Sequence, residues 1–188
     1  MPTPRLQDYV RVYDDGLPAE LCRELIASFE SSSGLHQANG RRYKAGLEDS
    51  AWTELNVTRA VDQRALDFFW QRIDASLARY NRDLGLPIAI PNSQKTADLI
   101  LKRYRVGANE RFQLHFDALN EVSNRYLVLL WYLNDVTEGG ETVFPDLELA
   151  IAPRAGRLLM FPPYWMYQHA GRPPVSGAKY ILSTYLLF

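Results

Sequence analysis

The pattern of apolar and polar positions changes near residue 98 of this 188-residue chain. Before that point, apolar side chains recur every three or four residues in two segments, as on the buried face of a helix. We therefore predict helices over residues 16–31 and 60–84. Residues 35–57, between them, are polar with scattered aromatic side chains, and we predict a loop with short strands there. The two apolar stripes consist of Leu21, Leu25, Ile26 and Phe29, and of Val61, Ala65, Phe68, Phe69, Ile73, Leu77 and Tyr80.

After residue 98, short apolar runs are separated by turn residues, and no helical pattern lies between them. Repeated short strands of this kind are typical of an all-β barrel or sandwich. The eight predicted strands cover residues 98–104, 111–117, 125–133, 141–144, 147–153, 157–162, 166–170 and 178–188.

Two of these runs, residues 125–133 and 178–188, are apolar on both faces. A strand has this composition when one face packs inside the barrel and helices cover the other. We predict one mainly β domain over residues 1–188 with N-terminal helices. Its helical buttress would span about 1–97, and its β core about 98–188.

Composition narrows the possible partners. The 21 basic and 22 acidic residues give a net charge of −1, so there is no overall positive charge for binding nucleic acid or an anionic membrane. No apolar run reaches the length of a membrane-spanning helix, and the first residues lack the pattern of a signal peptide. The single cysteine, Cys22, allows no internal disulfide. We expect a cytoplasmic protein with no nucleic-acid or membrane partner.

The three histidines make the search for a metal site short. His115 and Asp117 lie two residues apart on a predicted strand, so their side chains point to the same face. His169 lies on a second predicted strand. Two histidines and one carboxylate form the facial triad of non-haem Fe(II) oxygenases, which leaves coordination positions open. The His-x-Asp pair alone is weak evidence, and ordinary barrel histidines remain the alternative.

Lys179 alternates along the last predicted strand with largely apolar side chains. An ammonium group inside a barrel is costly unless an anion pairs with it, and the same strand offers no neighbouring carboxylate. An inward Lys179 would therefore favour a dicarboxylate co-substrate. A solvent-facing Lys179 is the alternative.

These residues occur together with Tyr132-Leu133-Asn134-Asp135 and with the block from Glu138 to Pro145 (EGGETVFP), and Lys179 follows His169 by ten positions. This combination, over roughly residues 98–188, resembles the prolyl 4-hydroxylase-like branch of the 2-oxoglutarate- and Fe(II)-dependent oxygenases. The resemblance implies a double-stranded β-helix, or jelly-roll, core buttressed by helices.

The resemblance also implies a site. His115, Asp117 and His169 match the iron ligands, Lys179 matches the residue that pairs with the distal carboxylate of 2-oxoglutarate, and Tyr104 and Thr142 resemble further residues of that pocket. The implied cofactors are Fe(II), the co-substrate 2-oxoglutarate, O2 and ascorbate. The implied reaction hydroxylates an unactivated C–H bond and converts 2-oxoglutarate to succinate and CO2. We expect a prolyl, other amino-acid-like, peptidyl or protein substrate.

Two other classes stay open at this point. A cupin-like metal enzyme would use the histidines and the aspartate without 2-oxoglutarate, and Lys179 would then be incidental. A barrel without turnover would serve as a binding module. The loop with Arg41, Arg42, Lys44, Tyr43 and Trp52 is either a solvated surface or a lid over the metal.

Overall fold

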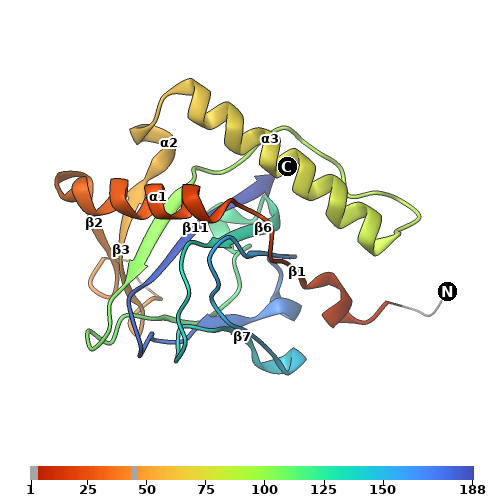
Figure 1. Cartoon of the computed structure of the whole chain (residues 1–188). Helices are drawn as coiled ribbons and strands as arrows, with labels where there is room; N and C mark the ends of the chain where they lie inside the picture. The colour runs from red at the N-terminus through yellow and green to blue at the C-terminus, as the bar shows by residue number, and fades with distance from the viewer. Residues whose placement is uncertain (1–3, 44–45) are drawn as a thin grey trace.

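The computed structural model describes residues 4–43 and 46–188, so Lys44 of the predicted lid lies outside the described residues. Two antiparallel sheets form the core (Figure 1). The larger has the order β1 (Arg11–Tyr13), β9 (Leu158–Phe161), β6 (Arg125–Tyr132), β11 (Lys179–Leu187), β4 (Ile100–Tyr104), β3 (Ala51–Asn56) and β2 (Gln37–Gly40). The smaller has the order β5 (Phe112–His115), β10 (His169–Gly171), β7 (Thr142–Phe144) and β8 (Leu149–Ile151).

In the described part of the chain, three α-helices accompany the sheets: α1 (Ala19–Ser31), α2 (Val57–Ala60) and α3 (Gln63–Leu84). Short 3-10 turns connect other elements, at η1 (Leu6–Tyr9), η2 (Ser33–Leu35), η3 (Asn120–Val122), η4 (Pro145–Leu147) and η5 (Trp165–Tyr167). The predicted mainly β class with N-terminal helices is confirmed, and the two stacked antiparallel sheets have the form of a double-stranded β-helix. No helix among residues 4–43 and 46–188 is both long and apolar enough to cross a membrane.

The central strand β6 is buried on both faces, as its sequence predicts. Leu127, Leu129 and Trp131 pack into a core cluster with α1 and α3. The alternating residues Val128, Leu130 and Tyr132 pack into a second cluster, between the two sheets. The helices therefore cover the outer face of the larger sheet (Figure 1), and the inner face lines the barrel, where a functional site can form.

The structure differs from the sequence prediction in two places. The helix predicted over residues 60–84 is interrupted at Val61, which is extended, and Asp62 caps the new helix α3 by accepting a hydrogen bond from the backbone of Ala65. The larger sheet also extends to strands before residue 98: β2 and β3 lie in the segment predicted as a loop with short strands, whereas β1 was not predicted. Strand β1 has only three residues, too few to show a period of two.

Candidate active site

Two histidines and one aspartate converge at the edge of the smaller sheet. His115 ends β5 and His169 begins β10, and the two residues are direct partners in the antiparallel register. Asp117 follows β5 by two residues, and its carboxylate oxygens lie 3.5 Å from Nε2 of each histidine. One potential ligand atom from each of the three residues lies within 4.8 Å of the others. The structure thus brings together the three ligands predicted from the sequence.

Backbone carbonyl groups orient both imidazoles. Nδ1 of His115 lies 2.8 Å from the carbonyl oxygen of Gln113, and Nδ1 of His169 lies 3.0 Å from that of Tyr167. A carbonyl oxygen only accepts hydrogen bonds, so both Nδ1 atoms carry a proton, and in the neutral ring Nε2 then presents a lone pair. Burial and the neighbouring His115 lower the pKa of His169 to about 4, so this ring is neutral at physiological pH.

The Asp117 carboxylate is buried and incompletely paired. Oδ1 accepts a 2.9 Å hydrogen bond from the hydroxyl of Tyr185, whereas Oδ2 is buried with no hydrogen-bond partner among the described residues. Burial raises the pKa of Asp117, but the two histidines lower it by more, so the carboxyl is ionised. An unpaired buried anion facing two imidazole lone pairs is the environment that a divalent cation satisfies. Two imidazoles and one carboxylate suit Fe(II) with open coordination positions.

A narrow cavity of about 40 Å³ extends from these ligands into the barrel. Tyr104, Thr142 and Lys179, all predicted from the sequence, line it. Tyr132, from β6, donates a 2.7 Å hydrogen bond to Oγ1 of Thr142 and so fixes that hydroxyl beside the cavity. We call this space the inner cavity.

Lys179 points inward, with 2% of its surface exposed. Its backbone pairs with that of Tyr104, and its Nζ lies 5.5 Å from the ring centroids of Tyr104 and Tyr132. Burial lowers the pKa of Lys179 to about 7, although the Glu141 carboxylate acts to raise it. A buried ammonium group of this kind attracts an anion, and the adjoining cavity has room for one.

Glu141 affects the pKa of Lys179, which sequence alternation does not predict. Alternation with Thr142 would turn its side chain away from the site, but β7 begins only at Thr142, so the strand pattern does not apply to Glu141. Its Oε2 is buried without a hydrogen-bond partner among the described residues, and its charge acts on Lys179. Glu141 lines neither cavity at the metal-ligand cluster.

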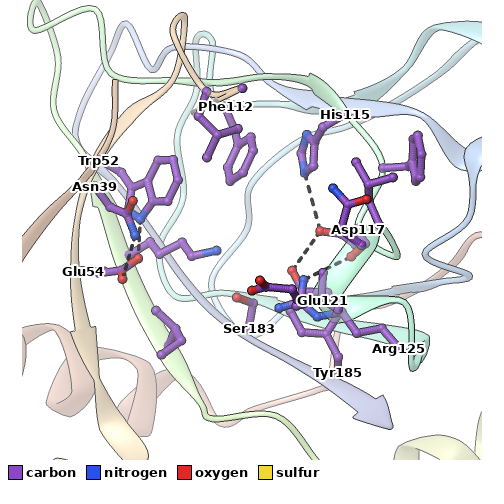
Figure 2. Close-up of a pocket in the computed structure, with 18 residues that line it drawn as sticks. Asn39, Trp52, Glu54, Phe112, His115, Asp117, Glu121, Arg125, Ser183 and Tyr185 are labelled. Atoms are coloured by element: carbon purple, nitrogen blue, oxygen red, sulfur yellow. Dashed lines mark hydrogen bonds and ion pairs between the residues drawn. The ribbon is translucent and has the colours of Figure 1, made fainter. Parts of the chain in front are cut away.

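A wider cavity of about 500 Å³, which we call the outer cavity, opens on the other side of His115 and Asp117. Figure 2 shows Asn39, Trp52 and Glu54 along one wall, and His115, Asp117, Arg125 and Tyr185 along the opposite side. Phe112 stacks on Trp52 at 4.7 Å and on His115 at 3.9 Å between ring centroids, so the aromatic surface is continuous up to His115.

The predicted lid only partly reaches this cavity. Trp52 lies on β3 and lines the outer cavity, whereas Tyr43 is 67% exposed and is absent from its lining. Next to His169, Trp165 is exposed and Tyr167 is buried in the core cluster between the sheets. Neither of these two aromatic residues lines the inner or the outer cavity.

Sequence reasoning assigned no role to several residues at the site. Alternation along the strands could have indicated two of them. Tyr185 lies on the same inward face of β11 as Lys179, and Lys102 lies on the same inward face of β4 as Tyr104. Tyr132 ends the inward face of β6. Glu54 and Arg125 could not be placed because their positions depend on how distant segments meet.

The sequence and the fold resemble those of known proteins. Residues 99–187 match the family model of the 2OG-Fe(II) oxygenase superfamily. The chain is 28% identical to Probable prolyl 4-hydroxylase 4 of Arabidopsis thaliana, over 47% of this chain and 41% of that protein. It is 32% identical to prolyl 4-hydroxylase subunit alpha-2 of Gallus gallus, over 46% of this chain and 19% of that protein. The chain thus aligns with less than half the length of these curated relatives.

Solved structures share the fold at lower identity. A viral collagen prolyl hydroxylase from Paramecium Bursaria Chlorella virus-1, as a 2OG complex, has a TM-score of 0.65 at 22% identity over 94% of both chains. A Pseudomonas putida prolyl-4-hydroxylase has a TM-score of 0.69 at 18% identity, over 95% of this chain and 92% of its own. A Trichoplax adhaerens prolyl hydroxylase, in complex with a peptide fragment of the hypoxia inducible factor oxygen degradation domain, has a TM-score of 0.72 at 16% identity, over 96% and 84%. The chain is therefore similar to the 2OG-Fe(II) oxygenase superfamily over residues 99–187, and the relatives and solved structures named above are prolyl hydroxylases.

Proposed function

We propose that this chain is an Fe(II)- and 2-oxoglutarate-dependent dioxygenase that hydroxylates an unactivated C–H bond of a prolyl or other amino-acid-like or peptidyl substrate. The observation that carries the proposal is the buried Oδ2 of Asp117, which has no hydrogen-bond partner among the described residues and faces two imidazoles whose Nδ1 atoms lie at hydrogen-bond distance from backbone carbonyl oxygens. A buried lysine stands beside the cavity that leads from this cluster into the barrel.

Each residue of the inner cavity has a role in this proposal. His115, Asp117 and His169 hold Fe(II), and the Tyr185 hydroxyl orients Asp117. Lys179 pairs with the distal carboxylate of 2-oxoglutarate. Thr142, fixed by Tyr132, is a further hydrogen-bonding group for that carboxylate. When bound, Fe(II) supplies the redox chemistry that couples decarboxylation of 2-oxoglutarate to succinate and CO2 with oxidation of the substrate.

The protein contributes position and a dry environment. The outer cavity shares His115 and Asp117 with the inner one, so a substrate held there lies next to the metal ligands. The stacked rings of Trp52 and Phe112 form an apolar wall beside it. Such a wall limits the access of water to the reacting atoms while the substrate C–H bond is held in place.

The test is succinate formation from 2-oxoglutarate, measured with and without Fe(II) and with a panel of free proline, proline-containing peptides and other amino acids. The proposal predicts formation that requires Fe(II) and is stimulated by at least one panel member. Mass spectrometry should then find an added oxygen in that substrate. Metal-dependent oxidation of a panel member without consumption of 2-oxoglutarate would favour the cupin-like alternative. Binding of a panel member without any turnover would favour the binding module.

Two further expectations belong to the proposal. Ascorbate should prolong turnover in the same assay, and its omission should shorten the linear phase of succinate formation. The cytoplasmic location also remains a prediction, and cell fractionation with an antibody against the chain tests it.

A further inference from the structure

Lys102 stands at the junction of the two cavities. It lies on β4, two residues before Tyr104, and its side chain lines both the inner and the outer cavity. Six residues line both spaces within the described part of the chain, and Lys102 is the only lysine or arginine in that set, which is Lys102, Phe112, His115, Asp117, Ser183 and Tyr185. The proposed function assigns no role to Lys102.

The ammonium group of Lys102 lies toward the outer cavity. Its Nζ is 5.5 Å from the ring centroid of Trp52 and 5.6 Å from that of Phe112. Trp52 lines only the outer cavity. In the inner cavity, Lys179 already provides a cation, and the two positive charges repel each other. Lys102 is therefore placed to meet an anion that enters from the mouth of the barrel.

A carboxylate stands directly beside this lysine. Glu54 on β3 is the register partner of Lys102 on β4. Side chains of directly opposed residues project from the same face of a sheet, with Cβ atoms about 5 Å apart. Glu54 also lines the outer cavity. A cationic and an anionic group are thus presented side by side, on the same wall.

Glu54 is held in place by its neighbours. Oε2 accepts a 2.5 Å hydrogen bond from Nε1 of Trp52, and Oε1 accepts a 3.0 Å hydrogen bond from Nδ2 of Asn39 (Figure 2). A carboxylate oxygen can accept more than one hydrogen bond, so both oxygens retain capacity for a ligand donor. The wall is therefore pre-organised, which lowers the entropy cost of binding.

We propose that Lys102 and Glu54 together recognise a free, zwitterionic amino acid, with Lys102 binding its α-carboxylate and Glu54 its ammonium group. This inference rests on the proposed function and names the substrate class within it. The two charges of an α-amino acid are one carbon atom apart, which matches two opposite charges on adjacent positions of neighbouring strands. A residue inside a peptide carries neither charge, so this wall favours the free amino acid over the peptide.

The experiment varies charge on the substrate and on the protein together. Four probes share one ring: L-proline, L-prolinamide, N-acetyl-L-proline and N-acetyl-L-prolinamide, and the other free amino acids complete the panel. The proteins are the wild type, Lys102→Met, Glu54→Gln and the control Lys95→Met, which removes an exposed lysine outside both cavities. The readouts are the half-saturating concentration of each probe in succinate formation and the probe-induced change of the anaerobic Fe(II)–2-oxoglutarate absorption band.

We expect the wild type to bind a free amino acid at least tenfold more tightly than its doubly blocked form. Lys102→Met should raise the half-saturating concentration of the free amino acid about tenfold and that of its amide less than twofold. Glu54→Gln should weaken the free amino acid and its amide but not the N-acetyl form. Lys95→Met should match the wild type, and every variant should keep the absorption band, which shows that it has folded.

Three results would overturn the inference. The first is a wild type that prefers the doubly blocked probe or uses no free amino acid. The second is an equal loss for acid and amide in Lys102→Met. The third is a Lys102→Met protein that binds 2-oxoglutarate itself at least tenfold more weakly, which would assign the lysine to a carboxylate of the co-substrate. A wild type with no absorption band would instead refute the proposed function.

Discussion

The inner and the outer cavity meet at His115 and Asp117 but are built differently. The inner cavity is lined mainly by strands of the barrel after residue 98, and its key side chains are fully buried. The outer cavity takes one wall from β2 and β3, which come before residue 98, and another from the segment after Asp117. Among the described residues, Lys179 is the charged side chain other than histidine that lines the inner cavity alone, whereas Glu54, Glu121 and Arg125 line the outer cavity alone.

Because of this difference, the residues proposed to carry out the reaction and the residues proposed to select the substrate come from different parts of the chain. In the proposed function, the buried residues of the inner cavity hold a metal and a dicarboxylate. The walls of the outer cavity are more exposed and come from segments whose meeting depends on the whole fold. We therefore infer the reaction class from the residues of the inner cavity and the substrate class from the residues of the outer cavity.

The largest effect on Fe(II) binding should come from replacing Asp117, which lines both cavities. Asp117→Ala removes a metal ligand and should weaken Fe(II) binding by more than about 100-fold, since loss of a group that merely supports a ligand costs about 10–100-fold. The metal-free variant should still unfold in one cooperative transition, because the substitution removes only the Tyr185 hydrogen bond and the histidine contacts of one side chain. Isothermal titration with Fe(II) and thermal unfolding check both points.

The control for that variant is Asp146→Ala, which removes an exposed carboxylate outside both cavities. It should bind Fe(II) like the wild type. Unchanged affinity in Asp117→Ala would remove Asp117 from the ligand set.

Lys179→Met removes a charge that lines the inner cavity and not the outer one. Breaking a buried charge pair costs about 3 kcal/mol or more, so 2-oxoglutarate should bind about 100-fold more weakly. Fe(II) affinity should change less than about twofold, because the lysine is not a ligand. Titration of the Fe(II)-loaded protein with 2-oxoglutarate measures this, with Lys95→Met as the matched control. Equal affinity for the co-substrate in both variants would count for the cupin-like alternative.

Tyr185→Phe tests the support of Asp117 without removing a proposed metal ligand. The variant loses the 2.9 Å hydrogen bond to Asp117 and keeps the ring. Fe(II) affinity should fall about tenfold, the lower end of the range for groups that orient a ligand. Tyr180→Phe is the control, because Tyr180 lies on the same strand but bonds to Glu30 on the helix side. If the two variants behave alike, the hydroxyl of Tyr185 does not orient the ligand.

The smallest effect concerns stability and pH. The pKa of Lys179 falls from an ordinary 10.5 to about 7 in the folded chain. Between these values the unfolded chain binds more protons at this position, so this lysine makes the free energy of unfolding rise with pH. From pH 7 to 8 the wild type should gain about 1 kcal/mol relative to Lys179→Met in urea unfolding without metal or 2-oxoglutarate. Parallel pH profiles for the two proteins would show that Lys179 is not buried as an isolated cation.

Much of the inner cavity could be predicted from the sequence. Each of the eight predicted strands after residue 98 overlaps a strand of the structure, because alternation over short runs directly reports which face is buried. His115 and Asp117 lie two residues apart on one predicted strand, so their proximity is local. Lys179 could be placed by alternation along β11.

The rest depended on contacts between distant segments. The register of β3 against β4 brings Glu54 next to Lys102, and no local pattern encodes that register. Tyr185 was visible on the inward face of β11, but its bond to Asp117 requires the meeting of β11 with the segment after β5. The charge of Glu141 on Lys179 does not follow from alternation, because Glu141 lies just outside the strand.

The most direct test of the account is the anaerobic visible spectrum of the protein, titrated first with Fe(II) and then with 2-oxoglutarate. The account predicts a metal-to-ligand charge-transfer band that needs both additions. The band should be absent in Asp117→Ala, and in Lys179→Met it should appear only at much higher 2-oxoglutarate concentration. Tight binding of Fe(II) with no band at any concentration of 2-oxoglutarate would contradict the central claim that the inner cavity holds this co-substrate at the metal.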